Sequence, residues 1–336
     1  MFAEKSFAPL PTLILELFGF LPTRSDETKF SGFLRRAIAA MHVIGAWVSV
    51  VVQFLRLTPI LMQPISNQNA GTIVTLFSVV SGFSEYGRSA AMITIYYFKN
   101  NAFPRLSAGI TGLFTYKSQR KRFYQKWAKL ARFLSLLILM LQLIGQLFNW
   151  VPFLWFNENQ IDTGSGDGRN ITVRVKPAQS LVPSSVVWGC YYFQTSSFAL
   201  SQQMLVQAVT AGASLRTFLV EHNLGMAKLQ ADIKIGIHDR KSVEKELERV
   251  QKRYSDILVM NGVISGAFGN ILCIALRMDQ VTVLGMVAGA VANPPNGIVH
   301  WICACFLVLL FGCYCTVLFW PIVQVSEEVQ EFNIFT

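Results

Sequence analysis

The chain has 336 residues, of which 52% are hydrophobic and only 14% are charged. A soluble globular domain carries about 25% charged residues, so this composition argues against one. The net charge of +10 would suit nucleic-acid binding in a soluble protein, but here it is confined to the segments between long apolar runs, where it indicates membrane topology and no nucleic-acid partner.

Several of the apolar runs reach about 20 residues, which is the length a helix needs to cross a hydrocarbon core of roughly 30 Å. The runs are continuous and do not alternate with polar residues, so they predict helices and not the strands of a barrel. We therefore expect an all-α, polytopic transmembrane bundle in a lipid bilayer, forming a single domain over residues 1–336, with about six spans. The predicted spans are residues 37–57, 71–98, 128–150, 184–219, 257–292 and 298–323.

The segments outside these spans predict the orientation of the chain. Of the 29 Lys and Arg, 22 fall in the leader 1–36, in residues 99–132 or in residues 220–256, all on the side of the N-terminus. Basic residues collect on the cytosolic side of membrane proteins, so the N-terminus, the leader and a helical segment over 220–256 are predicted to be cytosolic. The loop 152–183 is then extracellular, and it contains the N-glycosylation sequon at Asn170.

The fifth span is unusually long and contains Arg277 and Asp279. Either its helix projects beyond the membrane or it breaks at these charges. An apolar stripe precedes it, at Val243, Leu247, Val250, Tyr254 and Ile257. Steps of three and four place these side chains on one helix face, which indicates either a simple extension of the fifth span or a packing surface between subunits.

The sequence shows no pattern typical of catalysis or metal binding. The four histidines have no second histidine at i+3 or i+4, and no span contains paired carboxylates, so we do not expect an enzyme. The pairs Cys303-x-Cys305 and Cys313-x-Cys315 lack the two-residue spacing and the His or acidic partners of a zinc site. We expect these cysteines to pack between helices, and we expect neither metal nor cofactor.

Candidate ligand-binding residues come from two features. Glu85 and Arg88 lie inside the second span at i, i+3, where they form either an internal ion pair or a polar contact in a ligand cavity or coupling element. Aromatic residues gather near the outer ends of the third and fourth spans, where they form either an interfacial belt or, with Gln146, Gln194 and Ser197, an apolar pocket with a few polar groups. The candidate ligand-binding residues are Glu85, Arg88, Gln146, Trp150, Tyr191, Tyr192, Gln194 and Phe198.

Several features, taken in order, resemble those of the insect odorant receptor family. They are Leu17-Phe-Gly-Phe-Leu-Pro22 before the first span, Pro152-Phe-Leu-Trp155 at the start of the long loop, the stretch 247–276, Cys305–Cys315 with Gly312, and Val325-Ser-Glu-Glu-Val329. The chain departs from the family at Arg253-Tyr254, where His-Gln is common. The resemblance covers nearly all of the chain, and the related gustatory receptors share the same layout.

The resemblance implies a subunit of an odorant-gated cation channel that forms a heterotetramer with the odorant receptor co-receptor. It also implies a plasma-membrane location in sensory-neuron dendrites and a volatile, hydrophobic ligand held among the second, third, fourth and sixth spans. A seventh, pore-lining helix is expected to follow Thr336, so the chain is expected to be truncated at its C-terminal end. The alternatives are a gustatory receptor of the same superfamily and a membrane transporter, the latter suggested by Glu85, Arg88 and a possible break in the fifth span. The sequence is also compatible with a purely structural membrane scaffold.

Overall fold

The structure is a computed structural model, and it describes most of the helical part of the chain. The described residues are 7–21, 28–61, 70–99, 101–112, 125–140, 142–144, 184–235, 240–292, 301, 302, 305, 309, 312 and 320. Within them the secondary structure is almost entirely helical, with no strand, so the all-α prediction is confirmed for this part of the chain. The sequon at Asn170, the loop 152–183 and most of the predicted sixth span lie outside the described residues.

Six helices carry the architecture. They are α1 (Pro9–Leu17), α2 (Lys29–Leu61), α3 (Ala70–Phe98), α4 (Ala102–Gly112), α6 (Ser184–Ile235) and α7 (Arg240–Ala292). A further helical segment, Gln125–Ile144, lies between α4 and α6 in the sequence. Neither α1 nor α4 is predicted from the sequence, because both are shorter than a span and lie in segments interpreted as connections.

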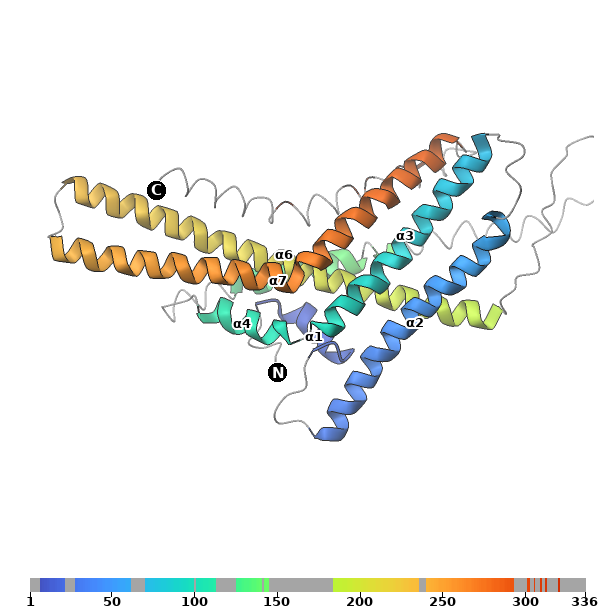
Figure 1. Cartoon of the computed structure of the whole chain (residues 1–336), viewed down its shortest axis with the longest axis horizontal. Coiled ribbons are helices and arrows are strands. Elements are labelled where there is room, and N and C mark those ends of the chain that lie inside the picture. The colour runs from blue at the N-terminus through green and yellow to red at the C-terminus, as the bar shows by residue number, and fades with distance from the viewer. Residues whose placement is uncertain are drawn as a thin grey trace, which may run out of the picture.

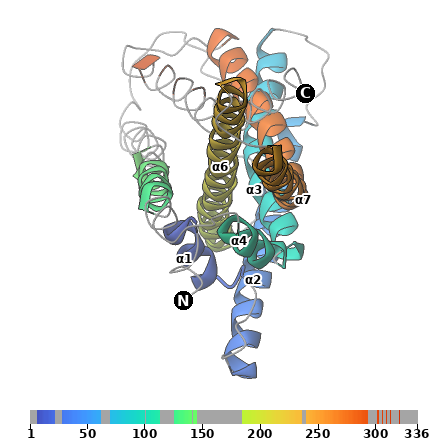
Figure 2. The same ribbon diagram turned by 90° about the vertical axis from the view of Figure 1, so that its left-hand side faces the viewer.

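The helices spread apart at one end of the molecule, and at the other end α6 and α7 form a long two-helix rod. Figure 1 shows α6 and α7 running side by side in the left half of the molecule, while α2, α3 and the end of α7 spread toward the upper right. Viewed along the rod, α1 and α4 lie at its base, close to α6 (Figure 2). The most extensive packing is between α3 and α7, and α6 contacts each of the other five labelled helices. The core therefore surrounds α6.

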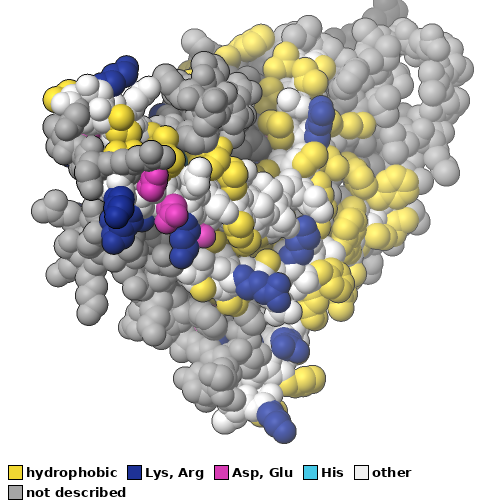
Figure 3. All heavy atoms as spheres, turned by 60° about the vertical axis from the view of Figure 1, so that its left-hand side comes forward, with side chains coloured by type: hydrophobic (Ala, Val, Ile, Leu, Met, Phe, Trp, Pro, Cys, Tyr) yellow, Lys and Arg dark blue, Asp and Glu magenta, His cyan; other side chains and the backbone are white. Residues whose placement is uncertain are grey.

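Helix α2 has the burial pattern of a helix in lipid. Its buried positions are small or polar, such as Ala39, Ala46 and Ser49, whereas large apolar side chains such as Ile44 and Val51 are exposed. A water-soluble helix has the opposite arrangement, while small residues at helix contacts and apolar residues outside are typical of membrane bundles. Figure 3 shows hydrophobic side chains gathered along one side of the molecule, beside scattered Lys and Arg.

Three helices of the described part are long and apolar enough to cross a membrane. They are Lys29–Leu55, Gln125–Ile144 and Lys241–Ala288. These coincide with the predicted first, third and fifth spans and indicate a membrane protein. The predicted second and fourth spans fall within α3 and α6, which are 29 and 52 residues long but are not among these three. The total of six spans and the cytosolic N-terminus stay predictions.

Helix α7 decides between the two expectations for the fifth span. It is one helix of 53 residues from Arg240 to Ala292, so the chain does not break at Arg277 or Asp279. At 1.5 Å per residue its length is about 80 Å, far more than the roughly 30 Å of a hydrocarbon core. The apolar stripe of residues 243–257 is therefore an extension of this helix, and its use between subunits stays a prediction.

The paired part of α6 and α7 contains a buried histidine. The ring of His222 stacks on Tyr254, with centroids 5.4 Å apart and planes 23° apart. Beside this stack, Arg253 Nη2 donates to Glu221 Oε2 at 3.3 Å. Burial lowers the pKa of His222 below its usual value, and the positive charge of Arg253 lowers it further. The neutral imidazole is therefore the form that the folded helix pair favours.

We expect the chain to lose stability in mild acid through His222. Because the pKa of His222 is lower in the folded chain than in the unfolded chain, its contribution is complete above the ordinary value of about 6.5 and is lost as the pH falls through that value toward the lowered pKa. The His222→Phe variant keeps an aromatic stack without a titrating group. Thermal unfolding in detergent between about pH 7.5 and about pH 5 should show a steeper loss for the wild type. Parallel curves would contradict the assignment.

Candidate functional site

A buried ion pair joins α3 to α7. Arg88 Nε lies 2.8 Å from Asp279 Oδ1, and Arg88 Nη2 donates to Asp279 Oδ2 at 3.1 Å. Both side chains are only 1% exposed. The two-point contact matches the planar fork of a guanidinium to the two oxygens of a carboxylate, which is the strongest geometry for such a pair. Charges inside a membrane bundle that face protein and pair with each other mark a position important for function or assembly.

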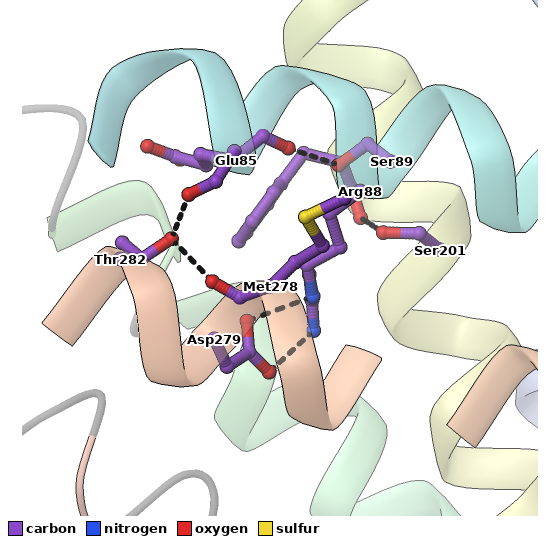
Figure 4. A network of polar contacts seen from close by, with 9 residues as sticks. Glu85, Arg88, Ser89, Ser201, Met278, Asp279 and Thr282 are labelled. Carbon is purple, nitrogen blue, oxygen red and sulfur yellow. Dashed lines mark hydrogen bonds and ion pairs between the residues drawn. The ribbon is translucent and has the colours of Figure 1, made fainter. Parts of the chain in front are cut away.

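Polar and aromatic groups surround this ion pair. One helical turn away, the hydroxyls of Ser84 and Thr282 share a hydrogen bond of 2.7 Å between α3 and α7. Glu85 is close enough to attract Arg88 and to repel Asp279. From α6, the ring of Phe198 lies 5.7 Å from Arg88 Cζ, within the range of a cation–π contact. Figure 4 shows Arg88 reaching from α3 toward Asp279, with α6 beside it.

The side of α6 that meets Arg88 is polar. Gln194, Ser197, Phe198, Ser201 and Gln202 recur at i, i+3, i+4, i+7 and i+8, so they share one face of the helix. We call these five residues the α6 polar face. Ser197, Ser201 and Gln202 are buried, at 0%, 0% and 1% exposure. The Ser201 hydroxyl donates to Phe198 O at 2.7 Å.

The α6 polar face has unused hydrogen-bonding groups. Within the described part of the chain, the hydroxyl of Ser197, the side-chain oxygen of Gln194 and both amide atoms of Gln202 are buried without a hydrogen-bond partner. Buried polar atoms in folded proteins are nearly always hydrogen-bonded, because an unmade bond costs about 1–3 kcal/mol. Such a set on one helix face offers hydrogen bonds to water or to a ligand.

Other polar side chains of α6 are used to hold the bundle together. Tyr96 Oη donates to Gln207 Oε1 at 2.7 Å, and Gln207 Nε2 donates to Thr12 Oγ1 at 3.2 Å, so one side chain joins α3, α6 and α1. The hydroxyl of Ser135 in segment 125–144 donates to Gln203 Oε1. Hydrogen bonds between helices replace the hydrophobic effect as a source of specificity in lipid. Gln202 is adjacent to Gln203 in the sequence, yet within the described residues its amide has no such hydrogen-bond partner.

An aromatic cluster lies where α6 meets α1 and α2. The ring of His42 contacts Phe18, Tyr192 and Phe193, at centroid distances of 5.1, 6.4 and 5.9 Å. His42 Nδ1 donates to Ile38 O at 2.9 Å. Tyr192 is 59% exposed, which fits a residue at the edge of the bundle better than one inside a closed pocket.

The structure brings together half of the predicted ligand-binding residues. Glu85 and Arg88 lie on α3 at the ion pair, Phe198 packs on Arg88, and Gln194 lies one turn before Phe198 on the same face. Tyr191 precedes Gln194 by three residues and so extends this face. Tyr192 belongs to the aromatic cluster. Gln146 and Trp150 lie outside the described residues.

Sequence analysis missed two residues at this position. Asp279 was interpreted only as an interruption of the fifth span, although a lone acid in an apolar helix needs an opposite charge and Arg88 was available. Gln202 was missed because nothing in the sequence distinguishes it from Gln203 and Gln207, which have partners in the structure. A step of eight residues from Gln194 was the available signal, since it places the two amides on one face.

The arrangement suits binding better than catalysis. It offers a neutral amide, a neutral hydroxyl and a carbonyl group beside an ion pair whose charges offset each other. Within the described residues, no three His, Cys, Asp or Glu side chains come close enough to hold a metal ion. No protein-family model matches the chain, and no curated protein matches it.

Proposed function

We propose that this chain is a chemosensory receptor subunit of the insect odorant receptor type. It binds a small, volatile, hydrophobic molecule within its membrane helices and gates a cation current together with the odorant receptor co-receptor. Its place is the plasma membrane of a sensory-neuron dendrite. The apolar helices and the ordered motifs support the membrane and family parts of this proposal, and the α6 polar face supports the binding part.

One observation carries the proposal: within the described residues, Gln202 is buried and both polar atoms of its amide are without a hydrogen-bond partner. Phe198 and Leu205 lie one turn before and about one turn after Gln202, and Leu205 is fully buried. Small-molecule sites are mostly apolar with a few polar groups that fix orientation. An amide left without partners inside a bundle has this character, whereas a purely structural glutamine has partners like those of Gln207.

The ion pair provides a physical connection between ligand binding at α6 and the packing of α3 against α7. Arg88 contacts the α6 polar face through Phe198 and holds α7 through Asp279. A ligand that displaces Phe198 therefore acts on the contact between α3 and α7. A ligand shifts such an equilibrium only by its difference in affinity for the two arrangements. The ion pair is a coupling element in this proposal, and it does not need to touch the ligand.

The transporter alternative has lost part of its basis. It depended on intramembrane charges and on a broken fifth span, and discontinuous helices are a common feature of transporter sites. Helix α7 is continuous through Arg277 and Asp279. Only the buried charges still favour a transporter, and a coupling element accounts for them equally well.

The test is an electrophysiological one with a transport arm. The chain is expressed with the co-receptor in oocytes, surface delivery is confirmed by labelling, and a broad panel of volatile compounds is applied. We expect an inward cation current with at least one compound and none with the co-receptor alone. Silence across the panel with the chain at the surface would contradict the proposal. Uptake of a compound into proteoliposomes without any current would favour the transporter.

A further inference from the structure

The unused groups of the α6 polar face define the chemistry of what binds there. A primary amide has a carbonyl that accepts and an NH₂ group that donates. In the described part of the chain, both ends of the Gln202 amide are buried and without a partner, and its side chain is 1% exposed. A ligand that completes this residue must therefore accept one hydrogen bond and donate another.

The neighbouring groups narrow the class further. Ser201 already donates to Phe198 O, and Gln203 Oε1 already accepts from Ser135. On the same face of α6, the Ser197 hydroxyl and the Gln194 side-chain oxygen are also without a partner in the described part of the chain. All of these are neutral. The charge of Arg88 is paired with Asp279 and also attracts Glu85, so an anionic ligand would find two carboxylates and an already paired cation in low dielectric, where an unpaired charge is very costly.

We infer that the ligand of the α6 polar face is a small aliphatic or aromatic alcohol, bound through Gln202. A hydroxyl donates to the Gln202 carbonyl and accepts from its NH₂ group, while the hydrocarbon part lies against the apolar surface that includes Phe198 and Leu205. An alkane leaves both amide atoms unsatisfied, an aldehyde or ester satisfies only the donor, and a carboxylate brings an unpaired charge. This inference rests on the proposed function and names the ligand class of the same site.

The experiment compares matched ligands on the whole chain in lipid nanodiscs. Binding of 1-octanol, octanal, octane and octanoate is measured by calorimetry and by the ligand-induced change in the thermal unfolding midpoint, with empty nanodiscs as the blank. The variants are Gln202→Leu and, as a matched control, Gln230→Leu, since Gln230 is an exposed glutamine on the same helix. Each variant is compared with the wild type by its ratio of octanol affinity to octane affinity. Because both ligands partition into the same lipid in every sample, this comparison cancels the effect of partition.

For the wild type and Gln230→Leu, we expect octanol to bind tighter than octane, octanal and octanoate. In Gln202→Leu, the octanol-to-octane ratio should fall by roughly 10-fold to 100-fold, which corresponds to the loss of two hydrogen bonds. Without ligand, the Gln202→Leu chain should be at least as stable as the wild type, because leucine removes an unsatisfied amide from an apolar interior. This second readout separates a ligand contact from a structural hydrogen bond, whose loss would lower stability.

The possible outcomes are distinct. Equal ratios in the wild type and in Gln202→Leu would overturn the inference and leave the receptor proposal in place, and they would indicate that buried water completes Gln202. Tighter binding of octanoate or octane than of octanol by the wild type would overturn it in the same way. Failure of the wild type to bind any volatile in either this assay or the current assay would overturn both proposals together.

Discussion

Replacing Arg88 with methionine is expected to destabilise the chain by about 3–5 kcal/mol, the usual cost of removing one partner from a buried ion pair. The buried Asp279 and the half-buried Glu85, which repel each other, would then remain without the guanidinium that attracts both. The measurement is the folded yield in detergent and the midpoint of thermal unfolding. Little monodisperse protein should be recovered from the Arg88→Met variant.

Replacing Asp279 with leucine should destabilise the chain less than Arg88→Met does. The ranking of the single and double variants by stability is therefore the sharper test. In Asp279→Leu, Arg88 still has Glu85 nearby, so the charge is not left alone. In the double variant Arg88→Met/Asp279→Leu only Glu85 is without a partner, and the apolar side chains pack well, so its stability should lie between those of the two single variants. Arg249→Met, in an exposed pair with Glu246, is the control and should change stability by less than about 1 kcal/mol. A double variant less stable than Arg88→Met would contradict this account.

The same pair should also matter for signalling if it couples α3 to α7. A receptor with Asp279→Leu that still reaches the surface should bind its alcohol with similar affinity but give a smaller current. Binding and gating separate in this way only for a residue that acts on the equilibrium between two states and does not touch the ligand.

Span length made the helical architecture predictable. The continuous apolar runs around Ala46 and Ile264 are too long for anything but a helix in lipid, and α2 and α7 confirm the helices. No proline occurs between Ser184 and Ile235, and α6 runs from the predicted fourth span into the predicted helical segment 220–256 as far as Ile235. The rest of that segment belongs to α7, which begins at Arg240. These are local properties, and a single sequence determines them well.

Contacts between helices were much harder to predict. The sequence placed Arg88 and Asp279 about 190 positions apart, and nothing local shows that α3 and α7 pack along each other. Glu85 was the candidate partner of Arg88 that the sequence offered, at i, i+3 on the same helix, and a pair between helices was not considered. Likewise, helix α1 was interpreted as part of a leader, although Phe7, Leu15 and Phe20 are buried in the core.

The α6 polar face shows why the site was only half predicted. Helical periodicity places Gln194 and Phe198 together, and that part of the prediction needed no tertiary information. Distinguishing Gln202 from Gln203 requires knowing which neighbours supply partners, and these come from segment 125–144 and from α1. The residues that sequence analysis could not rank are therefore those whose meaning depends on what packs against them.

Gly19→Ala is expected to have the second large effect, because Gly19 closes α1 in a conformation that alanine resists. Its φ is +76°, and the amides of Gly19 and Phe20 donate to the carbonyls of Glu16 and Leu15 at 3.1 and 2.9 Å. This is a Schellman ending, in which a left-handed glycine terminates the helix. A Cβ there would also lie 1.9 Å from the backbone oxygen of Arg35.

The cost of Gly19→Ala should exceed the roughly 1–2 kcal/mol of a left-handed non-glycine residue alone, since the clash is with backbone and no rotamer change relieves it. We expect α1 to detach from α6, with loss of the contact between Thr12 and Gln207 and a lower thermal unfolding midpoint. Gly225→Ala is the matched control, because Gly225 is a helical glycine with open space around its Cβ position, and alanine there should stabilise by about 0.5–1 kcal/mol. Equal effects of the two substitutions would show that α1 ends differently. A selective loss at Gly19 would explain in physical terms why a glycine stands just before the first span, a position that the family resemblance marked without giving a reason.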